Sequence, residues 1–338
     1  MKRINLFLPT VALLCFVCEA REKSPQYVNA ITKGAEAQFQ LHVVDNKGRP
    51  VSNATVRCCM SLLGADDTVV RGETDREGRL TITGKTTGSE ISIQVAKDGY
   101  YAWRGSYCLA DMRNRRMVLD GQWQPYGEKV TAVLRTFNHP CELAMSSKIH
   151  TIPSTNVWVG FDMELCDWTH PHGIGKTSDF QVLLQWDGRP PWEYPELVFG
   201  MRFQDRNAGA YVEHSSKESA FPYSYEFDAS HELCSTIDYF RRFDRKVGSW
   251  RRKELAEDEA LILRTRCETN AAGKVVSCNY ARITKLWFSA GEANGQGTVR
   301  LQYEYNSRVN DPNLENKIYS ERSGVALRRI EELNGSMK

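Results

Sequence analysis

Apolar and polar residues alternate along most of this chain, which is the pattern of β-strands that bury one face. Ala37, Phe39, Leu41 and Val43 share one face of a first expected strand, with polar side chains between them. The same period of two returns over residues 54–60, 91–95, 157–163, 223–227, 261–267 and 301–305. Turns that contain glycine, such as residues 45–50 and 75–78, separate the early strands. Many short strands of this kind predict an all-β protein built from sandwiches.

Helical signals are sparse by comparison. The charged segment from Trp250 to Glu259 could form one short helix, although it has no capping box. The tail at residues 328–338 is polar, and we expect it to fray. Strands and helices do not alternate along the chain, so a parallel α/β enzyme fold is disfavoured.

The length of 338 residues favours two domains. Residues 121–128 contain Gly121, Pro125 and Gly127, interrupt the alternation, and are the expected linker. We therefore predict a first sandwich over residues 36–120. A second, larger antiparallel β-sandwich or jelly roll is expected over residues 129–327.

The first expected domain resembles a known family. Residues 44–45, 48–51 and 54–56 are similar to the opening of a carboxypeptidase regulatory-like domain, and residues 74–80 and 95–100 resemble its later hallmarks in the same order. This resemblance implies a seven-stranded, transthyretin-like sandwich that usually serves as an accessory module and has no peptidase activity. Related modules bind starch or other glycans, so the resemblance also implies a possible carbohydrate role. Residues 265–277, 303–306 and 310–315 are similar to segments of exported bacterial proteins that carry such a domain in front.

The first twenty residues have the layout of a secretory signal peptide. Lys2 and Arg3 precede an apolar run from Leu6 to Val17, and residues 18–20 supply small side chains for cleavage. The run is shorter than the roughly 20 apolar residues of a membrane span, and no later segment approaches that length. We expect a secreted or periplasmic protein without a membrane span.

Cleavage after residue 20 would leave eight of the ten cysteines. An even number in an exported chain favours disulfides, and the mature sequence lacks the C-x2-C pairs typical of zinc sites. Cys267 and Cys278 flank an expected hairpin turn at residues 270–273. A four-residue loop would make them diagonal neighbours on one face, a tighter loop would set them opposite each other, and a three-residue loop would separate them onto opposite faces. We predict a disulfide between them.

Charge adds little to this picture. The chain has 44 basic and 42 acidic residues and a net charge of +2, which gives no bulk electrostatic reason to expect a nucleic-acid partner. Basic clusters at residues 241–246 and 251–253 are interleaved with acidic residues, so we expect an exposed, salt-bridged face.

A proline-rich loop at residues 186–195 is the candidate ligand-binding site. It holds three aromatic residues, Trp186, Trp192 and Tyr194, beside Asp187 and Arg189. Flat aromatic faces next to polar groups would suit sugar stacking, and prolines would keep the loop stiff. The alternative is that Trp192 and Tyr194 fold back over the core, since large aromatic side chains are more often buried.

His170 and His172 are candidates for a metal site. On a strand they would share a face with Asp167 or Asp179 in reach, but Pro171 and two nearby glycines favour a loop. No third ligand can be assigned, so we predict neither a metal nor a cofactor.

Catalytic signatures do not emerge from the sequence. Gly-x-Ser-x-Gly and Ser-x-x-Lys motifs are absent, and Asp162 and Glu164 are expected to share a solvated strand face. We therefore expect an exported, non-catalytic β-sandwich protein with a surface-structural or binding role, whose partner is a polysaccharide or another exported protein. The alternative is a secreted hydrolase acting on glycans, with facing carboxylates in the second domain.

Overall fold

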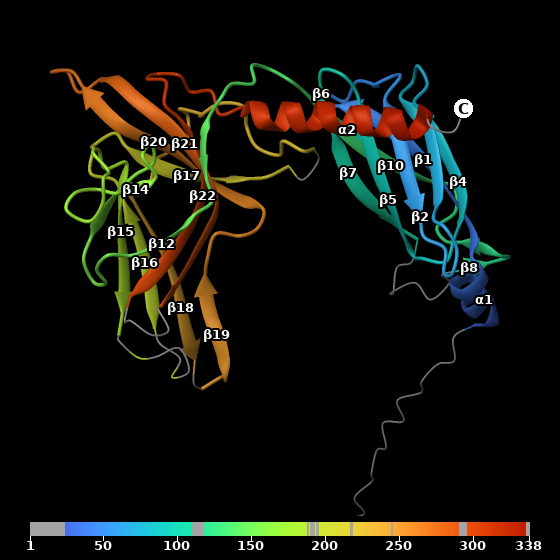
Figure 1. Cartoon of the computed structure of the whole chain (residues 1–338), viewed down its shortest axis with the longest axis horizontal. Helices are drawn as coiled ribbons and strands as arrows, with labels where there is room; N and C mark the ends of the chain where they lie inside the picture. The colour runs from blue at the N-terminus through green and yellow to red at the C-terminus, as the bar shows by residue number, and fades with distance from the viewer. Residues whose placement is uncertain are drawn as a thin grey trace, which may run out of the picture.

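The computed structural model describes residues 24–109, 118–187, 189, 193, 196–216, 219–244, 246–290 and 296–335. Two β-sandwiches stand side by side, and a single long helix, α2 (Lys317–Gly335), runs from the second across the first (Figure 1). This confirms the predicted all-β class. The expected signal peptide lies outside the described residues.

The first sandwich consists of two sheets. One joins its strands in the order β6-β10-β1-β9-β8, with β4 also paired to β1, and the other has the order β3-β2-β5-β7. Seven of these described strands have six residues or more: β1 (Ala35–Asp45), β2 (Thr55–Met60), β3 (Thr68–Glu73), β4 (Arg79–Thr86), β5 (Glu90–Ala96), β7 (Trp103–Cys108) and β10 (Glu128–Thr136). The other three have two residues each: β6 (Tyr100–Tyr101), β8 (Val118–Leu119) and β9 (Gln122–Trp123).

Alternation along the chain places the core of this sandwich where the sequence predicts it. Ala37, Phe39, Leu41 and Val43 are fully buried on one face of β1. The turn between β3 and β4 depends on Gly78, whose φ is +71°. A Cβ atom at this position would lie 2.4 Å from the carbonyl oxygen of Val43, so glycine is required for the close approach of the two backbones.

The expected linker at residues 121–128 lies inside the first sandwich instead. Gln122 of β9 pairs with Glu36, and β10, which begins at Glu128, pairs in parallel with β1 over seven residues. The sandwich therefore continues to Thr136, sixteen residues beyond the expected limit at residue 120. The glycines and proline of this segment form turns between paired strands.

Residues 328–335 belong to helix α2, where the sequence predicts a fraying tail. Ile330 is buried against Ala96 and Ala102, with Ala326 and Leu327 beside them. The side-chain hydroxyl of Ser323 accepts a hydrogen bond of 3.0 Å from the backbone N–H of Ala102. A few apolar contacts with the other domain thus order a mostly polar segment. A shorter helix, α1 (Pro25–Lys33), is capped by Ser24 and precedes β1.

The second sandwich has two six-stranded sheets whose strands pair antiparallel, as predicted. One sheet contains β11 (Ala144–Ser146), β12 (Ile149–Thr151), β17 (Gly209–His214), β20 (Glu259–Thr269), β21 (Val275–Ala290) and β22 (Gly297–Asn306). The other has the order β14-β13-β15-β16-β18-β19: β14 (Asp167–Trp168), β13 (Val159–Asp162), β15 (Phe180–Trp186), β16 (Leu197–Arg202), β18 (Thr236–Asp244) and β19 (Ser249–Lys253). Apolar residues of both sheets, such as Phe161, Phe199 and Phe288, form one core.

The predicted short helix from Trp250 to Glu259 is wrong. Residues 249–253 form β19, which pairs antiparallel with β18, and β20 begins at Glu259. Cross-strand pairing thus overrides the helical preference of a charged segment. Within the described residues, no helix is long and apolar enough to cross a membrane.

Candidate functional site

The loop that follows β15 holds the predicted aromatic site. Trp186 is half-buried against the core of the second sandwich, and its indole Nε1 donates a hydrogen bond of 2.9 Å to the carbonyl oxygen of Arg189. The guanidinium Nε of Arg189 lies 2.7 Å from the carboxylate of Asp187. Trp192 and Tyr194 lie outside the described residues. Trp186 therefore anchors the base of this loop instead of offering a flat exposed face.

Charge around Asp187 and Arg189 is paired within the loop. Burial alone would raise the pKa of Asp187. Hydrogen bonds from the Arg189 side chain and from the backbone N–H groups of Arg189 and Glu196 bring this pKa below its usual value. Contact with the Asp187 carboxylate raises the pKa of Arg189. Both side chains are thus charged, and Asp187 joins the two ends of the loop by accepting a hydrogen bond of 3.3 Å from the backbone N–H of Glu196.

His170 and His172 are exposed in a tight loop after β14. The N–H of His172 donates to the carbonyl oxygen of Thr169, and the N–H of Gly175 donates to that of Trp168. The carboxylate of Asp167 instead accepts hydrogen bonds from the backbone of Trp168 and Ile174. Among the residues that the structure describes, no group of three or more potential ligands is arranged to hold a metal ion.

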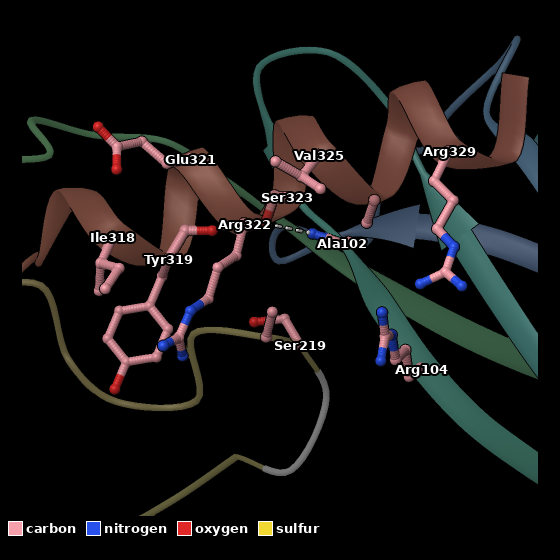
Figure 2. Close-up of a pocket in the computed structure, with 12 residues that line it drawn as sticks. Ala102, Arg104, Ser219, Ile318, Tyr319, Glu321, Arg322, Ser323, Val325 and Arg329 are labelled. Atoms are coloured by element: carbon pink, nitrogen blue, oxygen red, sulfur yellow. Dashed lines mark hydrogen bonds between the residues drawn. The ribbon is translucent and has the colours of Figure 1, made fainter. Parts of the chain in front are cut away.

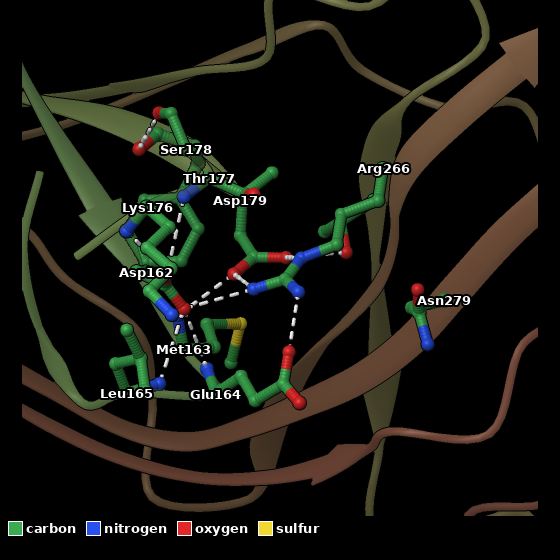
Figure 3. Close-up of polar contacts among 12 residues, drawn as sticks. Asp162, Met163, Glu164, Leu165, Lys176, Thr177, Ser178, Asp179, Arg266 and Asn279 are labelled. Carbon is green, nitrogen blue, oxygen red and sulfur yellow. Dashed lines mark hydrogen bonds and ion pairs between the residues drawn. The ribbon is translucent and has the colours of Figure 1, made fainter.

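A polar cluster at one end of the second sandwich ties its two sheets together (Figure 3). Arg266 of β20 extends between three carboxylates of the opposite sheet and its loops. Its Nη2 lies 2.8 Å from Asp162, its Nε lies 2.9 Å from Asp179, and its Nη1 lies 2.5 Å from Glu164. Arg266 has a φ of +50° at an irregularity in the pairing of β20 with β21, a conformation that ordinary residues adopt only when their surroundings enforce it.

The pKa values of the two aspartates in this cluster are shifted in opposite directions. Burial would raise the pKa of Asp162, but backbone N–H donors from residues 165, 176 and 177 and the charge of Arg266 bring it below its usual value. Burial raises the pKa of Asp179, and its contacts with Arg266 and Thr265 offset this only in part. Burial of Asp162 contradicts the prediction that it faces solvent. Its partner Arg266 is far away in sequence, so alternation could not reveal the contact.

The carboxylates of Asp162 and Asp179 have both oxygen atoms occupied by protein donors. One oxygen of Asp162 accepts from the N–H groups of residues 164 and 165, and the other accepts from those of residues 176 and 177. Asp179 accepts from the Thr265 hydroxyl at 2.8 Å and from the backbone of Met163 at 2.7 Å. A general acid or base must direct an oxygen at its substrate. The two aspartates thus join the sheets and have every oxygen engaged by a protein donor, whereas Glu164 is half exposed and contacts Arg266 through one oxygen.

Glu315 occupies the junction between the two sandwiches. Its side chain is buried and accepts hydrogen bonds from the Tyr101 hydroxyl at 2.7 Å and from the backbone of Asn138 at 2.8 Å and of His139. Arg135 of β10 donates a hydrogen bond of 2.9 Å to the carbonyl oxygen of Phe221, which belongs to the second domain. The segment between the domains is therefore fixed by contacts that neither domain makes alone.

A second buried ion pair lies close to this junction. Arg282 of β21 is fully buried and pairs with Glu304 of β22. Its guanidinium also donates to the carbonyl oxygen of Leu314 at 2.9 Å and lies 4.7 Å from the ring centre of Tyr223. Alternation in the sequence gave no sign that Arg282 faces inward.

Cys267 and Cys278 lie opposite each other across the hairpin of β20 and β21. Thr265 pairs with Asn279 and Glu268 pairs with Ser277, so Arg266 and Cys267 together face Cys278 at a bulge. Both cysteines are free thiols in the structure, and the Cys278 thiol lies 3.1 Å from the Tyr280 hydroxyl. Burial raises the pKa of Cys267 to about 12. The disulfide stays a prediction.

The basic clusters of the second domain form a salt-bridged face, as predicted. Arg241 pairs with Glu254, Arg242 pairs with Glu196, and Arg251 lies 2.9 Å from the carboxylate of Asp244, all described residues.

Comparison with known proteins adds no assignment of function. No protein-family model and no curated protein sequence matches the chain significantly. Among solved structures, the chain is similar to 3-chlorocatechol 1,2-dioxygenase from Rhodococcus opacus 1CP, with 13% identity, a TM-score of 0.24, and coverage of 31% of this chain and 61% of that one. It thus spans about three fifths of the length of that dioxygenase.

Pilins are also among the similar structures. The shaft pilin SpaA from Lactobacillus rhamnosus GG has 12% identity and a TM-score of 0.22, with coverage of 73% of this chain and 86% of that one. BcpA, the major pilin subunit of Bacillus cereus, has 8% identity and a TM-score of 0.21, with coverage of 78% and 95%. At these values the likenesses say nothing about what this chain binds or catalyses.

Proposed function

We propose that this chain is an exported, non-catalytic β-sandwich protein with a surface-structural or binding role, located outside the cell or in the periplasm. The observation that carries the proposal is the junction, where Glu315 and helix α2 join the two sandwiches. Buried hydrogen bonds to a charged group are strong and directional, so they hold two domains in one orientation. A fixed spacing between two sandwiches suits a protein that presents surfaces to a partner.

The resemblance to a carboxypeptidase regulatory-like domain supports the same role, because that module is usually an accessory to other domains. The seven longer strands of the first sandwich agree in number with the strands that this resemblance implies. The carboxylates of the Arg266 cluster serve the packing of the sheets, which weighs against the alternative of a glycan hydrolase acting at that place.

Polysaccharide is the partner that we propose for the loop at residues 186–195. The contacts of Trp186 and Asp187 with Arg189 hold the described base of this loop. A stiff loop loses little conformational entropy when it binds.

A glycan array probed with the mature protein tests this role, together with release of reducing sugars from the same polysaccharides. We expect binding to polysaccharide without release of reducing sugars. Release of sugar by the pure protein would contradict the proposal and favour the hydrolase. N-terminal sequencing of the exported protein should begin at Arg21, and a retained N-terminus would contradict the predicted location.

Trp192→Ala locates the binding to the loop. We expect weaker binding to polysaccharide and an unchanged melting temperature, because truncation of a buried tryptophan typically costs about 3–5 kcal/mol while an exposed one costs little. Trp250→Ala is the matched control, since Trp250 is a partly exposed tryptophan on β19 of the same sandwich. Loss of stability in Trp192→Ala would mean that this residue is part of the core.

A further inference from the structure

Arginine side chains line the outer face of the four-stranded sheet in the first sandwich. Arg57 of β2 stands opposite Arg71 of β3 on one side and Gln94 of β5 on the other, and Gln94 stands opposite Arg104 of β7. Neighbouring strands are about 4.8 Å apart, so these residues form one row across all four strands.

Helix α2 lies beside this row. It packs on Ala96 and Ala102, which are the next residues on the same face after Gln94 and Arg104. Arg322 and Arg329 of the helix line a cleft of about 610 Å³ together with Arg104 and Ser219. Figure 2 shows the side chains of Arg104 and Arg329 turned into this cleft from opposite sides, with Arg322 extending toward Ser219. We call Arg57, Arg71, Arg104, Arg322 and Arg329 the arginine strip.

Charge on the arginine strip is not neutralised within the described part of the chain. None of its five guanidinium groups lies within ion-pair distance of a described carboxylate, and the one acidic residue in the cleft, Glu321, pairs with Lys317 at 3.4 Å. The Nε atoms of Arg57 and Arg71 are shielded from solvent and make no hydrogen bond among these residues. Like charges directly opposite each other on a sheet are destabilising, and a buried donor without an acceptor is costly. An anion bound to these guanidinium groups would relieve the repulsion between them.

Residues beside the strip favour a carbohydrate anion over an acidic protein. On one side of the row lie the exposed hydroxyls of Ser92 and Ser106, and the amide of Gln94 lies within it. Hydroxyl and amide groups can hydrogen-bond to sugar hydroxyls, whereas the centres of protein interfaces are enriched in aromatic and apolar side chains. The three strand arginines lie in one row across the sheet, a width that fits one extended polymer chain.

We propose that the arginine strip binds an acidic polysaccharide through carboxylate or sulfate groups. Guanidinium groups bind both kinds of anion through paired N–H donors. The inference rests on the proposed binding role but uses a surface on the other domain from the loop at residues 186–195.

Binding of the full mature chain to immobilised polymers tests the proposal. The probes are polygalacturonate for carboxylate groups, dextran sulfate for sulfate groups, neutral dextran, and polyglutamate as an acidic polypeptide. We expect binding to at least one acidic polysaccharide that weakens as salt is added, with little binding to dextran or polyglutamate. A preference between the first two probes identifies the anion. Equal binding to polyglutamate, or binding to neither acidic polysaccharide, would overturn the proposal.

Arg104→Glu combined with Arg329→Glu localises the site. Each lost charge-assisted contact is worth about tenfold in affinity, so the double variant should bind about 100-fold more weakly. The matched control is Arg252→Glu combined with Lys253→Glu, which changes the net charge equally at exposed positions on β19 of the second sandwich, and it should stay within about twofold. An equal loss in both variants would show a non-specific charge effect and refute the site.

Two further measurements distinguish failure of the arginine strip from failure of the proposed function. Arg104→Gln with Arg329→Gln should give an intermediate loss, and the melting temperatures of all variants establish that each is folded. Trp192→Ala should leave binding to the acidic polymers unchanged. If the arginine variants bind as the wild type does while Trp192→Ala loses glycan binding, the arginine strip is refuted and the proposed function stands.

Discussion

Two groups of arginine side chains, one in each sandwich, stand in opposite surroundings. In the second, Arg266 and Arg282 extend into protected positions and meet carboxylates from the opposite sheet or the neighbouring strand. In the first, Arg57, Arg71 and Arg104 stand on the outer face of a sheet without a described carboxylate in reach. The same residue type thus stabilises one domain and leaves an unsatisfied charged surface on the other. A net charge of +2 for the whole chain conceals this difference.

Glu304→Ala should give the largest effect on stability. It would leave the fully buried Arg282 guanidinium without its carboxylate, and removal of one partner of a buried pair typically costs about 3–5 kcal/mol. Urea unfolding measures the loss. The double variant Glu304→Ala with Arg282→Met should recover part of it, since no charge then remains buried. A single variant as stable as the wild type would show that Arg282 is hydrated.

Glu315→Ala should loosen the junction between the domains. Hydrogen bonds to charged groups contribute about 1.5–3 kcal/mol, and this carboxylate accepts from Tyr101 and from the linking segment at residues 138–139. We expect faster proteolysis near residues 137–140 and separate melting of the two sandwiches in calorimetry. Glu142→Ala, at an exposed ion pair with Lys317, is the control and should melt as the wild type does. One transition in Glu315→Ala would contradict this role.

Asp162→Asn should reveal the pH dependence of the Arg266 cluster. The pKa of Asp162 is lowered in the folded state, so its contribution to stability is complete above the ordinary value of 3.8 and is lost as the pH falls through the folded pKa. At pH 6 the variant should be less stable by about 1–3 kcal/mol, and this gap should narrow below pH 3.8. Melting curves between pH 3 and 6 measure it.

Asp179→Asn should change the pH dependence of stability in the opposite direction to Asp162→Asn. The pKa of Asp179 is raised in the folded state, so its ionisation opposes folding above the ordinary value and its protonation favours folding as the pH falls. Relative to the variant, the wild type should therefore gain stability with acidification. Parallel pH profiles for the two variants would contradict the opposite assignments.

Arg71→Gln should have the smallest effect. It relieves the repulsion with Arg57 and breaks no described ion pair, so the free energy of unfolding should fall by no more than about 0.5 kcal/mol. Arg266→Gln, measured beside it, should cost several times more. If the two substitutions cost the same, the contrast between the sandwiches is not real.

Local patterns in the sequence predict the strands and turns of the core but not the contacts between distant segments. Phe39 and Leu41 are buried as their alternation indicates, and Gly78 adopts the positive φ that its turn requires. The side chain of Asp162, by contrast, is buried by a guanidinium 104 residues away. Helix α2 is ordered by a few contacts of residues such as Ile330 with the other domain, which its own polar sequence does not show.

The candidate site is predictable to a similar extent. Composition alone locates the aromatic loop at residues 186–195, and the structure adds how Trp186 and Arg189 hold its base. The arginine strip has no sequence signature, because Arg57, Arg71 and Arg104 become neighbours only through the register of four strands. Register depends on side-chain packing across strands, and a single sequence does not reveal it.

Parallel pairing of β1 with β10 has a consequence for where this chain can be cut. A fragment that stops at residue 120 keeps β4 on one side of β1 but leaves the backbone groups of residues 39–45 on the other side without β10. An open strand edge of this kind recruits other strands, so such a fragment should self-associate. A chain that emerges N-terminus first during synthesis has the same open edge until residue 136 is free to pair. During that interval it must be kept from pairing with other copies of itself.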